Sequence, residues 1–143
     1  MTKAVKQEST PVEEQQKPKY TKEELLTILD TLLFEGEYRE DVLIKSKLKV
    51  TFTTRSAAST AEITRELDSK KFNLLSSMQE YKALLCICHS ITRYGDKDLT
   101  IISQEKKKEF IEKLPSVMVA AISNALVDFD IKTEAALQES DAF

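Results

Sequence analysis

The chain has 143 residues, of which 41% are hydrophobic and 31% are charged, an ordinary balance for one globular domain. Its net charge of −3 argues against a general nucleic-acid binder, which is normally basic, and no apolar run approaches the roughly 20 residues that cross a bilayer. We therefore expect neither a specific nucleic-acid partner nor a membrane.

The first 20 residues are rich in Lys, Gln, Glu, Ser, Thr and Pro and carry too little apolar surface to offset the entropy of ordering. We predict a disordered N-terminal tail over residues 1–20, without a secretory signal, that either aids solubility or folds on a partner. Residues 21–138 are predicted to form a single helical domain, and residues 139–143 a short C-terminal tail.

A capping box and an alternating segment open the predicted domain. Thr21 and Glu24 can cap each other's backbone amides at the start of a helix, and Gly36 is a candidate stop. Residues 38–55 then alternate between apolar and polar side chains, which predicts a β-hairpin. A lone hairpin is marginal in water, so it must lie on the helices or join a partner's sheet.

Residues 72–95 carry apolar side chains at helical spacing over about six turns, which predicts a central long helix. Asn73 is a candidate N-cap, and Gly95 is a candidate C-terminal residue. The expected fold class is α+β and predominantly helical, with about five helices around this central helix and one β-hairpin.

Two further helices are predicted after Gly95. Ser103 can cap a helix over residues 104–114, in which Lys106, Lys107 and Lys108 are expected to form a solvated face. Pro115 suits the start of the last helix, about residues 116–138. Val119 and Val127 lie off the main apolar face of this last helix, so we expect it to be contacted once by its own core and once by a neighbour.

The residues with the strongest chemistry are Cys86, Cys88 and His89. Structural zinc normally has four ligands, and Cys86 and Cys88 point about 200° apart around a helix. We therefore expect reduced thiols in a cytoplasmic setting, no metal and no cofactor. No phosphate loop or nucleophile motif appears, so we expect no enzyme. Basic residues on the hairpin, with Phe52 among them, leave a phosphate-binding ribbon as an alternative.

Three stretches occur in a recognisable order: the hairpin leading into an Ala/Thr-rich segment (48–57), residues 81–99, and residues 108–116 with the final helix. This layout resembles small tail proteins of long-tailed bacteriophages, including tail assembly chaperones, over about residues 20–143. The resemblance implies a non-enzymatic chaperone in the host cytoplasm. It would coat the tape measure protein during tail morphogenesis and be absent from the finished particle.

A chaperone of an amphipathic helix needs an apolar groove between its own helices. The candidate partner-binding residues are Met78, Met118, Val119, Val127 and Phe52. The two methionines are chosen because methionine adapts to varied partners, although filling the core is the more common role of such residues. The expected partners are the tape measure or another tail protein, together with self-association. The alternatives are a structural virion subunit of the tail or baseplate, a host-directed binding protein and an unrecognised enzyme.

Overall fold

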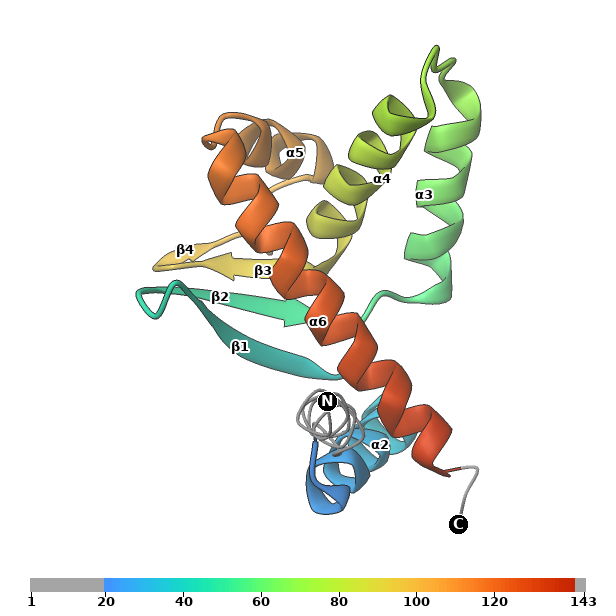
Figure 1. Cartoon of the computed structure of the whole chain (residues 1–143), viewed down its shortest axis with the longest axis vertical. Coiled ribbons are helices and arrows are strands. Elements are labelled where there is room, and N and C mark those ends of the chain that lie inside the picture. The colour runs from blue at the N-terminus through green and yellow to red at the C-terminus, as the bar shows by residue number, and fades with distance from the viewer. Residues whose placement is uncertain (1–19, 141–143) are drawn as a thin grey trace, which may run out of the picture.

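The computed structural model describes residues 20–140, and within that range it contains five helices and a four-stranded antiparallel sheet (Figure 1). The elements are α2 (Lys22–Glu35), β1 (Arg39–Ile44), β2 (Leu48–Thr53), α3 (Ala57–Ser69), α4 (Leu75–Ser90), β3 (Ile91–Tyr94), β4 (Lys97–Asp98), α5 (Gln104–Glu112) and α6 (Ser116–Ser140). The predicted class, α+β and mostly helical, is confirmed. The tail predicted over residues 1–20 lies outside the described residues except for Tyr20, and α6 continues into the predicted C-terminal tail.

The predicted hairpin is the β1–β2 pair, in a register that joins Arg39 with Thr53 and Ile44 with Leu48. It is one half of a larger sheet, whose strand order is β1-β2-β3-β4. Three residues connect the strands, and the amide of Lys47 donates to the carbonyl oxygen of Ile44 at 3.2 Å. The two central residues of this tight turn, Lys45 and Ser46, are left-handed, with φ values of 54° and 58°. The sheet thus gives the hairpin the partner strand that a lone pair lacks.

The prediction of one helix over residues 72–95 is wrong at both ends. The N-cap is Leu74, which has no capping side chain, and α4 ends at Ser90. The backbone becomes extended at Ile91 because β3 pairs with β2, opposing Ile91 to Phe52. Gly95, with a φ of 58°, turns between β3 and β4 instead of ending a helix. The longest helix among the described residues is therefore α6 and not α4.

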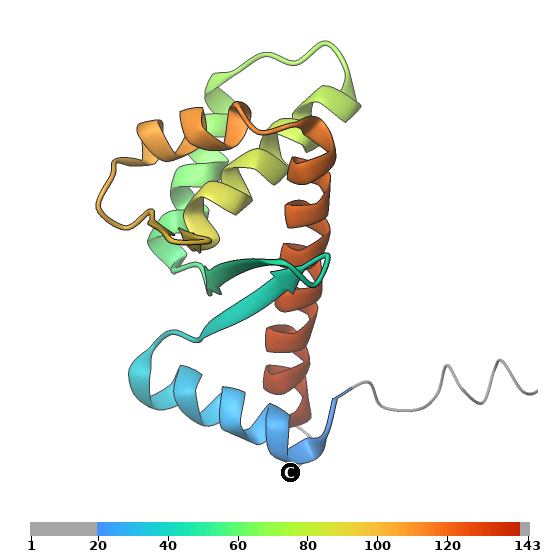
Figure 2. The same cartoon turned by 90° about the vertical axis from the view of Figure 1, so that its left-hand side faces the viewer.

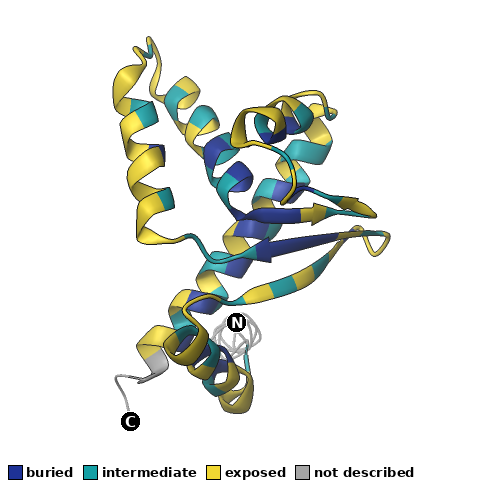
Figure 3. Cartoon of the chain, turned by 180° about the vertical axis from the view of Figure 1, so that it is seen from behind, coloured by how far each residue is buried: buried dark blue, intermediate teal, exposed yellow. Residues whose placement is uncertain are grey.

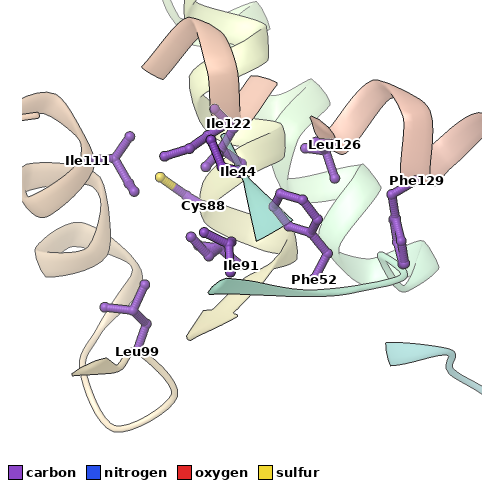
Figure 4. Packing of buried hydrophobic residues seen from close by; sticks show 11 residues of the cluster. Ile44, Phe52, Cys88, Ile91, Leu99, Ile111, Ile122, Leu126 and Phe129 are labelled. Atoms are coloured by element: carbon purple, nitrogen blue, oxygen red, sulfur yellow. The ribbon is translucent and has the colours of Figure 1, made fainter. Parts of the chain in front are cut away.

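The main core fills the space between the sheet and helices α4, α5 and α6 (Figure 4). Phe52 from β2, Ile91 from β3 and Ile122 from α6 are fully buried in it. The ring of Phe129 lies 5.8 Å from that of Phe52. Seen from behind, β2 is mostly buried while α3 is largely exposed (Figure 3). The sheet and its helices therefore enclose one continuous apolar centre.

A second, smaller cluster joins α2 to the C-terminal part of α6 (Figure 2). Its buried members are Leu25 and Ile28 on α2 and Ala136 on α6. We call α2 with this part of α6 the arm, and the sheet with α3, α4, α5 and the first part of α6 the body. Thr21 caps the arm helix by accepting a hydrogen bond from the Glu24 amide at 3.1 Å, and Gly36 (φ 82°) ends it, as predicted.

The predicted solvated lysine face on α5 needs correction at Lys107. Ser103 caps this helix as predicted, and Lys106 is exposed. Lys107, however, is buried, and its Nζ donates to the carbonyl oxygen of Ile91 at 3.2 Å. Burial lowers the pKa of Lys107 below its ordinary value. This contact lies at the point where α4 becomes β3, so the lysine stabilises the transition that the sequence did not reveal.

Candidate partner-binding groove

An apolar groove of about 530 Å³ lies between α4, α5 and α6. Its apolar lining consists of Ala83, Leu84, Ile111, Leu114, Val119 and Ala120. The corner between α5 and α6 sets its shape, because the carbonyl oxygen of Pro115 accepts hydrogen bonds from the amides of Met118 and Val119 and so begins α6 directly after α5. α4, α6 and the corner residue Leu114 thus present small and aliphatic side chains to one concave surface, above the buried Ile111 of α5.

Polar groups also line the groove. The carboxylates of Glu80 on α4 and Glu112 on α5 belong to its lining, as do the hydroxyls of Ser116 and Ser123 on α6. No lysine or arginine is among these lining residues. The groove therefore combines an apolar surface with negative charge, which suits an apolar ligand that carries positive charge.

The five candidate partner-binding residues do not form one surface. Only Val119 lines the groove; Met118 is its half-buried neighbour on α6, and Met78 lies half-buried in the first half of α4. Val127 is exposed on α6 away from the groove lining. Phe52 must be corrected, because its ring is fully buried in the core and offers no surface to a partner in this fold.

Sequence reasoning missed the small residues that open the groove. Ser116, Ala120 and Ser123 recur on α6 at helical spacing, opposite Ala83 on α4. Small side chains at such spacing keep a helix face shallow, and this pattern was a readable signal. The sequence prediction missed these residues because it took methionine, and not small side chains, as the marker of a binding surface.

The cysteine–histidine cluster has the features of a structural site. Cys86 and Cys88 are free thiols, and burial raises the pKa of Cys88 to about 12, which keeps this thiol protonated and weakly nucleophilic at neutral pH. Burial also lowers the pKa of His89, whose Nε2 lies 4.0 Å from a carboxylate oxygen of Glu62. Within residues 20–140, no three His, Cys, Asp or Glu side chains are grouped so as to hold a metal ion.

Two polar networks tie the helices of the body together. Tyr81 on α4 donates to the carboxylate of Glu66 on α3, and Lys108 on α5 donates to the Tyr81 hydroxyl oxygen at 2.8 Å. Arg55 donates to the Ser90 hydroxyl at 2.7 Å and to the Asp130 carboxylate at 2.8 Å. These contacts fix α3 to α4 and α5, and join the end of β2 to α4 and α6.

The basic ribbon considered for the hairpin is partly neutralised. Arg55 is paired with Asp130, as described above, and Lys49 Nζ lies 3.9 Å from a carboxylate oxygen of Asp41 on the neighbouring strand. Paired cations release fewer counterions when they meet a phosphate, so they contribute less to nucleic-acid binding. The hairpin is thus a weaker candidate site than the groove.

No known protein family, curated protein or solved structure matches this chain. Among the helices of residues 20–140, none combines the length and the hydropathy needed to cross a membrane. The groove between α4, α5 and α6 is the surface with the clearest geometry for binding.

Proposed function

We propose that this chain is a non-enzymatic binding protein that holds an amphipathic helix of a client in the groove between α4, α5 and α6. The observation that carries the proposal is the groove itself, a concave space of about 530 Å³. Five apolar side chains on α4, on α6 and at the α5–α6 corner line it, above the fully buried Ile111 of α5. Helix-in-groove recognition buries the apolar face of the ligand helix on such a surface. The two thiols and the histidine take no part in this role.

The negative charge of the groove indicates that the client helix is basic. Glu80 and Glu112 lie in the lining, so a client helix with Lys or Arg beside its apolar stripe gains favourable electrostatic energy. Exposed charge pairs are screened by salt. Binding should therefore weaken as the ionic strength rises, while the apolar part of the affinity persists.

The resemblance to tail assembly chaperones supplies the setting for this activity. In that setting the client is the tape measure protein, a long helical protein that must be kept in solution until the tail tube polymerises around it. The chain would act in the host cytoplasm during virion morphogenesis, without a cofactor and without catalysis. Many copies along one client would bring the copies close enough for self-association.

The test is co-expression of a tagged tape measure protein with the wild-type chain and with Ala83→Glu. Ala83 lines the groove and is only partly buried, so the added carboxylate places an unpaired charge where the client's apolar face binds. We expect co-purification to fall at least about tenfold, which corresponds to about 1.4 kcal/mol. The matched control is Ala61→Glu, the same change at an exposed site on α3.

Equal co-purification of the wild type and the Ala83→Glu variant would contradict binding in this groove. Loss of co-purification in both variants would show that added negative charge alone disrupts the complex. Circular dichroism of each purified variant shows whether its fold is retained.

One observation favours the alternative of a structural virion subunit. β1 is an edge strand of the described sheet, and Leu43 on it is exposed. An exposed edge can pair with a strand of a neighbouring subunit. Arg39, Glu40 and Asp41 put charged groups along this strand, which opposes such pairing, so we favour the groove.

A further inference from the structure

The outward face of α6 carries a regular stripe of exposed residues, of which only Ala120 also lines the groove. In Figure 2, α6 runs along one edge of the molecule, and no described helix or strand lies beyond it. The stripe consists of Val117, Ala120, Asn124, Val127, Ile131, Glu134 and Gln138, all of them exposed. Val117, Val127 and Ile131 are 76%, 51% and 52% exposed. The spacing alternates between three and four residues, as at the a and d positions of a coiled coil.

We propose that this stripe docks a second copy of the same chain, with the two α6 helices parallel in a short coiled coil. In a parallel pair each a or d residue meets its own copy. Valine then faces valine, Ile131 faces isoleucine, and the two Asn124 amides can hydrogen-bond to each other. Against an apolar client helix, Asn124 would lose its hydrogen bonds to water without compensation. A polar Asn at one a position is a recurrent device for fixing register and number of strands.

The flanking positions agree with a parallel pair. At the flanking positions Ser123 faces Asp128 and Asp130 faces Ala135, so no two like charges meet there. Glu134, at a d position, meets its own copy, and this one like-charge contact weakens the C-terminal end of the pair. Asp130 is also paired with Arg55 at 2.8 Å within its own chain.

The antiparallel arrangement fits the same residues poorly. It would set Asn124 against Val127 and Val117 against Glu134, which leaves polar groups opposite apolar ones. Val117 and Ile131 are β-branched residues at a positions, which favours two strands over three or four.

A substitution in the stripe can disrupt the dimer without changing the client-binding groove. Of the stripe residues, only Ala120 lines the groove, while Val127 and Ile131 do not. The seam is only about three heptads long, and short helices are marginal on their own. The dimer is therefore weak and depends on protein concentration.

Sedimentation equilibrium of the full chain tests the pairing. We expect the wild-type mass to rise with concentration from the monomer value of 16.3 kDa toward twice that value. Val127→Asp and Ile131→Asp should each raise the dimer dissociation constant at least about tenfold. The control is Ile101→Asp, at an 80% exposed position outside α6, which should leave the dimer intact. A wild-type chain that stays monomeric at all concentrations, or a dimer that tolerates both α6 substitutions, would overturn the proposal.

Oxidative cross-linking tests the direction of the helices. In a Cys86→Ser background, Val127→Cys places a thiol at a d position, where the two parallel copies meet within disulfide reach. Asp128→Cys, one residue away on the flank, is the control and should cross-link far less. A dimer in which Val127→Cys forms no cross-link would overturn the parallel arrangement. Loss of client binding by Ala83→Glu does not bear on either result.

Discussion

The body and the arm differ in how much apolar surface they bury, although α6 runs through both. Eleven buried residues form the cluster of the body, and only three form the cluster of the arm. Burial of apolar surface is the main source of stability, so local unfolding should begin where least is buried. The N-terminal part of α6 is therefore packed in a large apolar core and its C-terminal part in a small one.

Contacts at the junction limit how independent the arm can be. The ring of Tyr38 stacks on Phe129 at 6.0 Å, and Tyr38 packs against both clusters. Lys132 Nζ lies 2.6 Å from a carboxylate oxygen of Glu40, which joins α6 to β1. The arm can therefore loosen at α2 while α6 stays attached to the sheet.

Phe52→Ala should have the largest effect, because it empties the centre of the body. Phe52 is fully buried and packs against Phe129. Truncation of such a ring costs about 3–5 kcal/mol, which urea denaturation would measure. A loss below about 1 kcal/mol would mean that the sheet is not the centre of stability.

A matched pair of truncations separates the body from the arm. Leu85→Ala in α4 should cost about 2–5 kcal/mol of the global free energy of unfolding, because Leu85 is buried in the body. Ile28→Ala in α2 should cost less, about 2 kcal/mol, because the arm can open locally before the body unfolds.

Hydrogen exchange shows which helices and strands each of these substitutions destabilises. Ile28→Ala should accelerate exchange in α2 and leave β2 unchanged, whereas Leu85→Ala should accelerate both. Equal acceleration of α2 and β2 by Ile28→Ala would show that the arm and the body unfold as one unit.

Thr21→Ala should have a smaller effect, confined to the arm. The Thr21 hydroxyl caps α2 through the Glu24 amide, and loss of such a cap costs about 1 kcal/mol. Ser56→Ala removes the corresponding cap of α3 in the body and serves as the comparison. Exchange in the first turn of α2 should rise only for Thr21→Ala.

The smallest expected effect is the pH dependence that His89 contributes to the body. Burial lowers the pKa of His89 below 6.5, although Glu62 opposes this shift. The unfolded chain then binds a proton more readily than the folded one, so stability falls as the pH drops below 6.5 through the folded-state pKa. His89→Gln should lose less stability than the wild type between about pH 7.5 and about pH 5.5 in urea titrations. Identical losses in both proteins would contradict a buried His89.

Local signals were sufficient for most helix ends and for the hairpin. Thr21 and Ser103 accept the capping hydrogen bonds that their side chains suggested, and the alternation around Val50 and Phe52 identified a strand. These features depend on residues near one another in the sequence. They could be read without knowledge of the fold.

The end of α4 could not be read in the same way. Cys88, Ile91 and Tyr94 continue the helical spacing, and Gly95 resembled a helix stop. Pairing with β2 makes Ile91 extended, and this long-range contact overrides the local pattern. The burial of Lys107 has the same origin, because its acceptor, the Ile91 carbonyl, exists in that position only once β3 has formed.

The candidate binding site was predicted least well. Val119 alone was placed in the groove by both sequence and structure, because a groove depends on how three helices meet and not on the composition of one. Val127 is instead part of the stripe on α6 that is proposed to pair with a second copy of the chain. Phe52 was chosen for its aromatic ring among basic residues, but its position on the inner face of β2 buries it.

The function proposed for this chain is to assist tail assembly without remaining in the particle. Quantitative mass spectrometry of purified mature particles beside the infected-cell lysate tests this most directly. We expect abundant protein in the lysate and none in the particle. Stoichiometric amounts in the particle would contradict the chaperone function and favour a structural subunit that pairs through β1.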